Sequence, residues 1–289
     1  MKVRQLDGRM SGPTMDRRGF VTGVAMGVAG VAGGAAWGFG PGADEVLLTR
    51  HDLVVPGLPP NLAGLTIAHV TDVHLPANEA ASAHALGLLA AVKPAVTLFT
   101  GDIVEGRDGT EALVRFAERA RGTVANYAVI GNWEQDRGVT PDMLRTLYQR
   151  AGVTYLHNER IELEVGGARL GIAGLDDPAS GTPEPARVVP SGPRADVELC
   201  MVHAPAIADR LPEGWSSHCN LILAGHTHGG QIRIPFVPAI LPRASGRFVS
   251  GWYRDADAPL YVSRGIGTTG LRARWRCPAE LAVFTLRAG

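Results

Sequence analysis

The stretch Leu65-Thr66-Ile67-Ala68-His69-Val70-Thr71-Asp72-Val73-His74 decides the fold, because a short apolar run ends in an aspartate and a histidine. A run of this length bounded by polar residues is typical of a buried β-strand. In open α/β sheets the carboxyl ends of the strands line one crevice, where ligands bind. We therefore expect Asp72 and His74 to lie in such a crevice.

Four further strand-like runs end in the same kinds of residue. They are followed by Gly101-Asp102, Gly131-Asn132, His203 and Gly225-His226-Thr227-His228. A single histidine after a strand is usually structural, but five strand ends that all carry such side chains indicate a common site. Asp, Asn and His offer the oxygen and nitrogen atoms that suit Zn, Fe or Mn. The sequence therefore predicts a metal centre whose candidate ligands are Asp72, His74, Asp102, Asn132, His203, His226 and His228.

Helices and strands are expected to alternate in the first half of the chain, whereas strands dominate the second half. The predicted helices are 81–92, 111–121 and 141–151, and Pro141 is a good first-turn residue. The predicted strands are 46–55, 65–70, 96–100, 125–130, 162–165, 169–173, 197–202, 221–224, 260–262 and 281–286. This order predicts a layered α/β architecture with mixed sheets. No repeat or low-complexity linker follows residue 43, so we expect one domain over residues 44–289.

Composition excludes several classes of protein. The 289 residues include 28 Lys and Arg against 28 Asp and Glu, so the formal net charge is zero. A protein that coats nucleic-acid polymers would show a basic excess, and we expect no such binding. The 45% of hydrophobic residues excludes a disordered chain. Three cysteines do not make a disulfide framework; Cys200 and Cys219 are expected to be core thiols, with one facultative disulfide as the alternative.

Residues 1–43 have the features of an export signal. Arg17-Arg18 precede a stretch rich in glycine and alanine, and no charged residue occurs from Gly19 to Ala43. Basic residues before an apolar stretch are typical of an export signal, and the paired arginines resemble a twin-arginine (Tat) signal. The alternative is a membrane tether, and an uncleaved signal would be both. We therefore expect export by the Tat machinery to the periplasm, the cell wall or the outer face of the cytoplasmic membrane, with membrane association through the N-terminus if the signal is retained.

The ordered set Asp-x-His, Gly-Asp, Gly-Asn, one His and Gly-His-Thr-His resembles the motifs of the calcineurin-like metallophosphoesterases. The flanking Gly229-Gly230-Gln231 and the closing Arg276-Cys277-Pro278-Ala279-Glu280-Leu281 are similar to the exported or membrane-tethered, phosphodiesterase-like branch of that superfamily. The resemblance covers roughly residues 45–286, nearly all of the chain after the signal. It implies a four-layer α-β-β-α sandwich, in which two mixed sheets are flanked by helices.

The resemblance also implies a dinuclear site with two divalent or trivalent ions of Mn, Fe or Zn. The implied ligands are Asp72, His74 and His228 for the first ion, Asn132, His203 and His226 for the second, and Asp102 as the bridge. Two divalent ions and two carboxylates leave about two positive charges, which attract a phosphate ester and stabilise its transition state. A metal-activated hydroxide would attack phosphorus. Asp102, Asn132 and His203 are the residues expected to take part in catalysis.

One position departs from the pattern of the family. Most relatives have a His directly after the Gly-Asn pair, which is thought to stabilise the transition state or protonate the leaving group, whereas this chain has Trp133. Indole cannot donate a catalytic proton in the useful pH range. We therefore expect a phosphodiester or a pyrophosphate-linked substrate, carrying a lipid or a nucleotide, whose leaving group needs little protonation. Trp133 would then bind the substrate by stacking on a base or covering an acyl chain, or else it packs at the floor of the cleft.

The predicted function is a metal-dependent phosphoester hydrolase at the cell surface. The alternative is a weakly active or non-catalytic metal protein that binds phosphorylated envelope polymers or lipids, and only Trp133 supports it. Among weaker candidates, Asp176-Asp177-Pro178 favours a turn, and 265–270 is expected to be a turn near the cleft. Arg272, Arg274 and Arg276 form either a basic rim that faces anionic lipid or substrate, or a solvated strand face.

Overall fold

The computed structural model describes residues 42–212, 215–256 and 258–289. The predicted signal or tether at 1–43 lies outside these residues, except for its last two positions. Among the described helices, none is both long enough and apolar enough to span a bilayer.

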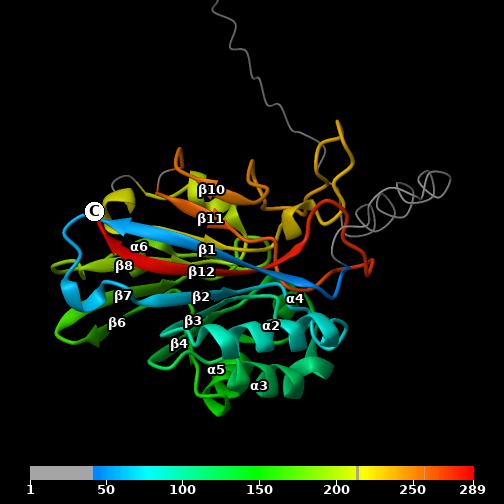
Figure 1. The fold of residues 1–289 in the computed structure, drawn as a ribbon, viewed down its shortest axis with the longest axis horizontal. Helices are drawn as coiled ribbons and strands as arrows, with labels where there is room; N and C mark the ends of the chain where they lie inside the picture. The colour runs from blue at the N-terminus through cyan, green and yellow to red at the C-terminus, as the bar shows by residue number, and fades with distance from the viewer. Residues whose placement is uncertain (1–41, 213–214, 257) are drawn as a thin grey trace, which may run out of the picture.

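Two six-stranded mixed sheets stack against each other (Figure 1). The first has the order β1 (Val46–Val55), β12 (Ala279–Ala288), β2 (Thr66–Val70), β3 (Val96–Thr100), β4 (Ala125–Val129) and β5 (Thr154–Tyr155). The second has the order β10 (Gly251–Tyr253), β11 (Leu260–Val262), β9 (Leu221–Ala224), β8 (Val197–Met201), β7 (Ala168–Gly174) and β6 (Glu159–Val165). Neighbouring strands are parallel except at β12–β2, β6–β7 and β10–β11. The predicted α/β fold with two mixed sheets is confirmed.

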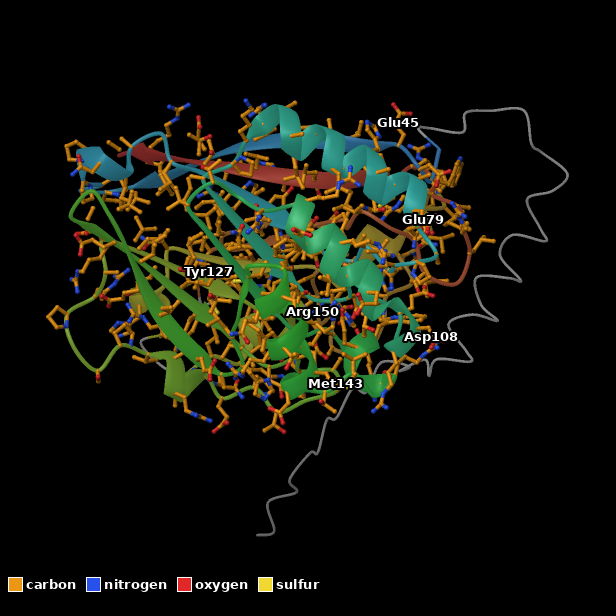
Figure 2. All side chains as sticks on the ribbon, turned by 90° about the horizontal axis from the view of Figure 1, so that it is seen from below. Glu45, Glu79, Asp108, Tyr127, Met143 and Arg150 are labelled. Carbon is orange, nitrogen blue, oxygen red and sulfur yellow. The ribbon has the colours of Figure 1, made fainter. Side chains whose placement is uncertain are left out.

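Helices cover the outer face of the first sheet (Figure 1). They are α2 (Glu79–Val92), α3 (Thr110–Arg119) and α5 (Pro141–Arg150), and Figure 2 shows this layer with Glu79 on α2 and Arg150 on α5. Phe99 from β3 and Tyr148 from α5 are fully buried between helices and sheet. The helix predicted to begin at Pro141 does so, and the Thr140 side chain accepts a hydrogen bond from the backbone N–H of Met143 (3.3 Å), which caps it.

Among the described residues, the outer face of the second sheet carries short elements and no long helix. They are α6 (Pro185–Val188) and the 3₁₀ helices η3 (Pro205–Asp209) and η4 (Trp215–His218), and they pack Val188, Ile207 and Trp215 against the sheet. The fourth layer of the expected sandwich is therefore present, but it is built from single turns and loops. The remaining short helices are η1 (Pro60–Leu62), η2 (Arg107–Gly109), α4 (Asn132–Asp136) and η5 (His228–Gly230).

A third apolar core lies between the two sheets and fixes how they stack. Leu98 and Phe284 from the first sheet meet Leu170 and Leu223 from the second, and all four are fully buried. Because β3 is covered on one face by helices and on the other by the second sheet, all five of its residues are buried. This explains why β3 carries no charged residue and why its two polar residues, Thr97 and Thr100, are buried as well. The three cysteines are also buried, and each is a free thiol.

Candidate metal centre

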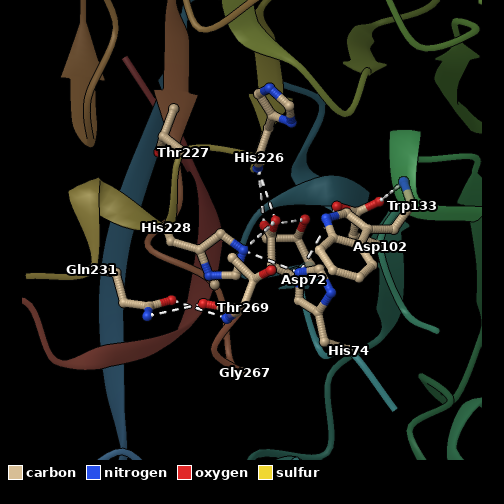
Figure 3. A network of polar contacts seen from close by, with 12 residues as sticks. Asp72, His74, Asp102, Trp133, His226, Thr227, His228, Gln231, Gly267 and Thr269 are labelled. Atoms are coloured by element: carbon tan, nitrogen blue, oxygen red, sulfur yellow. Dashed lines mark hydrogen bonds and ion pairs between the residues drawn. The ribbon is translucent and has the colours of Figure 1, made fainter. Parts of the chain in front are cut away.

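The seven predicted ligands follow five strands that belong to both sheets. In the first sheet, Asp72 and His74 follow β2, Asp102 follows β3, and Asn132 begins α4 after β4. In the second sheet, His203 follows β8, while His226 and His228 follow β9. The crevice predicted at one sheet edge is thus formed where the carboxyl ends of strands from two stacked sheets meet. Figure 3 shows Asp72, His74, Asp102, His226 and His228 close together there.

The first group of candidate ligands contains Asp72, His74 and His228, all buried. One ligand atom from each lies within 4.8 Å of the other two. The Nε2 atoms of His74 and His228 are 3.0 Å apart, and His228 Nε2 is 3.4 Å from Asp72 Oδ1. Burial lowers the pKa of His74 to about 3 and the pKa of His228 well below its usual value. Both imidazoles are therefore neutral, and one ring nitrogen of each lies near a carboxylate oxygen, as a cation site requires.

The second group contains Asp102, His203 and His226, and their ligand atoms are also within 4.8 Å of one another. Asp102 Oδ2 lies 3.0 Å from His203 Nε2, and Asn132 Oδ1 lies 2.9 Å from His226 Nδ1. Asp102 Oδ2 is also 3.8 Å from His74 Nε2 in the first group. Asp102 therefore lies between the groups, where a bridging ligand would have to be. That all seven residues are ligands, and that Asp102 bridges, stays a prediction.

Backbone carbonyls fix the tautomers of two of the histidines. His203 Nδ1 lies 2.8 Å from the carbonyl oxygen of Thr100, and His226 Nε2 lies 2.6 Å from that of Arg243. Because a carbonyl oxygen only accepts, each of these nitrogens must carry the proton. The opposite nitrogen of each ring, which faces the group, is then the one that can bind a metal.

The pKa values of the buried acidic residues and of His203 indicate the charge that this centre can hold. Burial raises the pKa of Asp72 and of Asp102 above the ordinary range for aspartate. Burial by itself would lower the pKa of His203, but Asp102 and the neighbouring carboxylates raise it well above its usual value. Buried carboxylates need positive charge nearby to stay ionised, and bound cations would supply it. The donor set and its electrostatics therefore fit two bound metal ions.

The backbone of the centre is held in an uncommon conformation. Asp72, His74, Asp102, His226 and His228 have φ between 49° and 73°, a left-handed region that few non-glycine residues adopt. Each such residue costs on the order of 1 kcal/mol or more, and the surrounding structure must impose it. Among the described residues, five of the eleven non-glycine residues with positive φ are candidate ligands.

Two glycines allow the loops to approach each other. A Cβ atom on Gly131 would lie 2.9 Å from Asp102 Cγ and closer still to Asp102 Oδ1. A Cβ atom on Gly225 would lie 2.8 Å from Thr71 Cγ2 and closer still to Asp72 Oδ2. A side chain at position 131 or 225 would therefore clash with a neighbouring loop, and only glycine fits there.

Glu134 holds the loops of the first sheet together, and we did not predict this role. Its buried carboxylate accepts hydrogen bonds from four backbone N–H groups, those of Gly131 (3.0 Å), Asp102 (2.9 Å), Ile103 (2.6 Å) and Val104 (3.1 Å). Burial and the nearby Asp102 raise its pKa to about 7. The available signal was an acidic residue in the first turn after Asn132, but α4 has only five residues and shows no helical periodicity.

Asn78 fixes a second pair of loops. Its side-chain amide donates to the carbonyl oxygens of His74 (3.1 Å) and Thr268 (3.0 Å), and its Oδ1 accepts from the backbone N–H of Thr268 (3.0 Å). The backbone N–H of Gly267 donates to the carbonyl oxygen of Asp72 (2.6 Å). The segment 265–270 is thus a turn that packs directly against the first group, as expected for a turn near the cleft.

The position of Arg274 differs from both alternatives that we predicted for it. It is neither on a basic rim nor on a solvated strand face, because it is buried and lies outside every described strand. Its guanidinium donates to the carbonyl oxygens of Arg264 (2.8 Å), Gly265 (3.1 Å) and Cys277 (3.3 Å). Arg272, Arg274 and Arg276 therefore belong to a loop, and the side chain of Arg274, the central one, is buried. Arg272 and Arg276 are exposed, as expected for a rim.

The turn predicted at Asp176-Asp177-Pro178 is present. Asp177 Oδ2 accepts hydrogen bonds from the backbone N–H groups of Ala179 (3.0 Å) and Ser180 (2.9 Å). This is the usual way in which an aspartate side chain closes a turn. Both aspartates are buried, so they act within the fold and do not form a solvent-facing rim.

Trp133 lies at the edge of the centre (Figure 3). Its backbone N–H donates to Asp102 Oδ1 (2.8 Å). Its ring meets His74 edge-on, with 5.1 Å between ring centres, and the guanidinium carbon of Arg137 lies 4.9 Å from its ring centre. The side chain is half-buried, so the ring both packs on a candidate ligand and keeps part of its surface open.

A cavity of about 390 Å³ adjoins the second group. Arg243, whose carbonyl oxygen binds His226, forms part of its wall. The other lining residues are Pro178, Ala179, Pro183, Ala206, Ile207, Arg210 and Ala244. An apolar pocket with two arginines suits a group that combines apolar and anionic parts.

Two stacked mixed sheets, with Asp- and His-containing groups at the strand ends, define a metallophosphoesterase. Residues 65–230 match the family model described as calcineurin-like phosphoesterase, and this chain belongs to that family. The protein is therefore a phosphoester hydrolase of a family that depends on a dinuclear metal centre.

Curated relatives extend this similarity over most of the chain. The chain is 27% identical over 290 residues to the uncharacterized metallophosphoesterase YkuE of Bacillus subtilis (strain 168), covering 95% of this chain and 98% of that relative. It is 28% identical over 254 residues to the phosphodiesterase YaeI of Escherichia coli (strain K12), covering 83% and 87%. Among solved structures, the NAD nucleotidase NadN of Haemophilus influenzae is similar over 70% of this chain and 50% of its own, with 16% identity and a TM-score of 0.46.

Proposed function

We propose that this phosphoester hydrolase acts outside the cytoplasm on phosphodiester or pyrophosphate-linked substrates, with a lipid or a nucleotide as part of the molecule. The observation that carries the proposal is Trp133, which follows Asn132 directly and offers its indole where a proton donor is expected in relatives. A substrate whose leaving group departs as a phosphate or a phenolate needs no such donor. An alkoxide leaving group would need one.

Each residue of the centre has a separate role in the proposed reaction. When bound, the two ions supply Lewis acidity and the positive charge that a phosphoryl transition state requires. Asp102 is held between the two groups by the backbone N–H of Trp133, and Glu134 holds the loop from which Asp102 projects. The protonated outer nitrogens of His203 and His226 keep their inner nitrogens available as ligands. In this proposal these side chains contribute to catalysis by positioning and by electrostatic stabilisation.

The surroundings of the centre suit a substrate with two different ends. The open part of the Trp133 ring offers an apolar face for a base or an acyl chain. The cavity beside Arg243 offers apolar walls and two guanidinium groups for the other end. A simple monoester would leave one of these two surfaces without a partner.

The N-terminal sequence supports a place outside the cytoplasm. The pair Arg17-Arg18 and the uncharged stretch from Gly19 to Ala43 are typical of a Tat signal. The Tat machinery would then be the export partner, and the periplasm, the cell wall or the outer membrane face the destination.

The test compares three substrates on the purified protein with added Mn²⁺. An aryl phosphodiester and a nucleotide diphosphate should be turned over at least about tenfold faster than an alkyl phosphate monoester, since only the monoester needs a proton donor. Trp133→His should raise turnover of the monoester relative to the diester, and Asp102→Ala gives the background rate. Faster turnover of the monoester by the unaltered protein would contradict the proposed substrate class.

A further inference from the structure

A strongly apolar loop protrudes beside the metal centre. It spans residues 232–242, and it begins four residues after His228. Phe236 is fully exposed, Val237 is 52% exposed and Ile240 is 36% exposed. Large apolar side chains that gather on an exposed loop mark a surface that contacts something other than water.

A second loop, at 269–276, joins the first. The backbone N–H of Arg233 donates to the carbonyl oxygen of Trp275 (3.0 Å), and the N–H of Trp275 donates to that of Gln231 (3.0 Å). Leu271 on this second loop is 37% exposed. The two loops lie on the same side of the molecule, at the right of Figure 1. We call residues 232–242 and 269–276 together the apolar rim.

All charged residues within the two loops of the apolar rim are arginines. No Asp or Glu occurs between residues 225 and 254 or between 258 and 279. Four exposed arginines lie on or beside the rim, namely Arg233, Arg243, Arg272 and Arg276. Within the described part of the chain, only Arg272 of these four forms an ion pair with a carboxylate. Apolar side chains among exposed arginines match an anionic lipid surface, where acyl chains lie beneath phosphate groups.

The chain also enters the fold at this rim. Arg272 pairs with Asp44, whose carboxylate is 3.0 Å from its guanidinium. Residues 19–43, which directly precede Asp44, carry no charge. The segment that would pass through or rest on a membrane is therefore attached at the same side of the fold as the exposed apolar loop. A tether and a lipid-binding loop on one side can contact the same bilayer together.

We propose that the apolar rim binds the surface of an anionic lipid bilayer. Phe236 and Val237 enter the boundary between headgroups and acyl chains, while Arg233 and Arg276 bind lipid phosphates. The rim connects to the metal centre through His228 at one end of the loop and Arg243, the partner of His226, at the other. The centre thus lies close to the membrane surface. This inference rests on the rim and Asp44, and it holds whichever phosphoester the enzyme cleaves.

The experiment places a fluorescent reporter on the loop of the full-length protein. Pro238→Cys is labelled with an environment-sensitive dye, because the three native cysteines are buried. The matched control is Val54→Cys, since Val54 is 58% exposed and β1 carries it to the opposite end of the molecule from Asp44. Each labelled protein is mixed with vesicles of phosphatidylglycerol and phosphatidylcholine, or of phosphatidylcholine alone. A site-specific signal separates the loop from any binding by residues 1–43.

We expect the label at position 238 to shift to the blue and to be shielded from an aqueous quencher only on vesicles with phosphatidylglycerol. The label at position 54 should not change. Adding Phe236→Ser with Val237→Ser should abolish the shift, and Arg233→Gln with Arg276→Gln should weaken vesicle affinity roughly 25-fold, or about fivefold for each arginine. Thermal unfolding of each variant checks that the fold is retained.

Three results would overturn the proposal. One is the absence of a shift at position 238 on anionic vesicles. Another is an equal shift at both labelled positions, which would assign binding to another part of the chain. A third is a shift that depends on protein concentration without vesicles, which would assign the rim to a second copy of the protein.

Discussion

Replacing Gly131 by alanine should inactivate the enzyme although the change adds a single methyl group. The residue has φ −112° and ψ 176°, which alanine adopts without strain, so only space decides the outcome. The new Cβ would lie 2.9 Å from Asp102 Cγ and closer still to Asp102 Oδ1. Carbon atoms prefer a separation of about 3.5–4.0 Å, so the two loops must move apart by about 1 Å.

Two effects of different size follow from this displacement. Crowding a packed interior by one methyl group costs about 1–3 kcal/mol of unfolding free energy. A displacement of about 1 Å at a catalytic group costs on the order of 10²-fold in rate. Asp102 lies between the two groups of candidate ligands, so its displacement should also weaken metal binding. Activity and metal content should therefore fall far more than stability does.

The assay measures urea unfolding, metal content and kcat/KM on an aryl phosphodiester. The control is Gly87→Ala in α2, where a Cβ would meet nothing within 4 Å. Alanine in a helix is more stable than glycine by about 0.5–1 kcal/mol, and this variant should keep full activity and metal content. If Gly131→Ala retains kcat/KM within about twofold and binds metal normally, the close approach of the two loops is not needed and the reasoning fails.

Three further predictions follow from the same geometry. Glu134→Gln should weaken metal affinity about 10–100-fold without removing a ligand, measured by competition with a chelator; unchanged affinity would show that Glu134 does not position the loops. Burial raises the pKa of Asp177 from 3.8 to about 6, so its proton binds more tightly in the fold and native stability falls as pH rises from about 4 to 6. Asp177→Asn should therefore gain up to about 3 kcal/mol relative to the unaltered protein between pH 4 and pH 8, as measured by urea unfolding, and a pH-independent difference would contradict this. Removing metal with a chelator should lower the unfolding temperature, because metal at 100 times its Kd contributes about 2.7 kcal/mol, and an unchanged temperature in differential scanning calorimetry would argue against bound metal.

The sequence predicted the elements that carry the candidate ligands because each strand is a short, mostly apolar run that is followed by a glycine or by metal-ligand types of residue. Periodicity alone did not show that these strands belong to two sheets, since it carries no information about which sheet a strand joins; only the family resemblance implied two sheets. The fourth layer was expected as helices, yet α6, η3 and η4 each span at most five residues. Segments that short do not produce a helical pattern.

The roles of Glu134 and Arg274 were not predicted, because each depends on contacts with distant parts of the chain. Glu134 acts on the backbone N–H groups of residues that lie about thirty positions earlier in the chain, and a short motif cannot reveal such a contact. Arg274 was placed at the surface because arginine is seldom buried. In the fold, several carbonyl oxygens of neighbouring loops satisfy its donors. Contacts of this kind exist only once the loops have been brought together.

Direct counting of metal ions gives the sharpest test of the account. Elemental analysis of the purified protein, after reconstitution with Mn²⁺, Fe²⁺ or Zn²⁺, should find two ions per chain, and Asp102→Ala should lose metal together with activity. A chain that hydrolyses phosphodiesters while holding one ion or none, or an Asp102→Ala variant that retains both ions and full turnover, would contradict the claim that strand ends of two sheets bind a pair of cations.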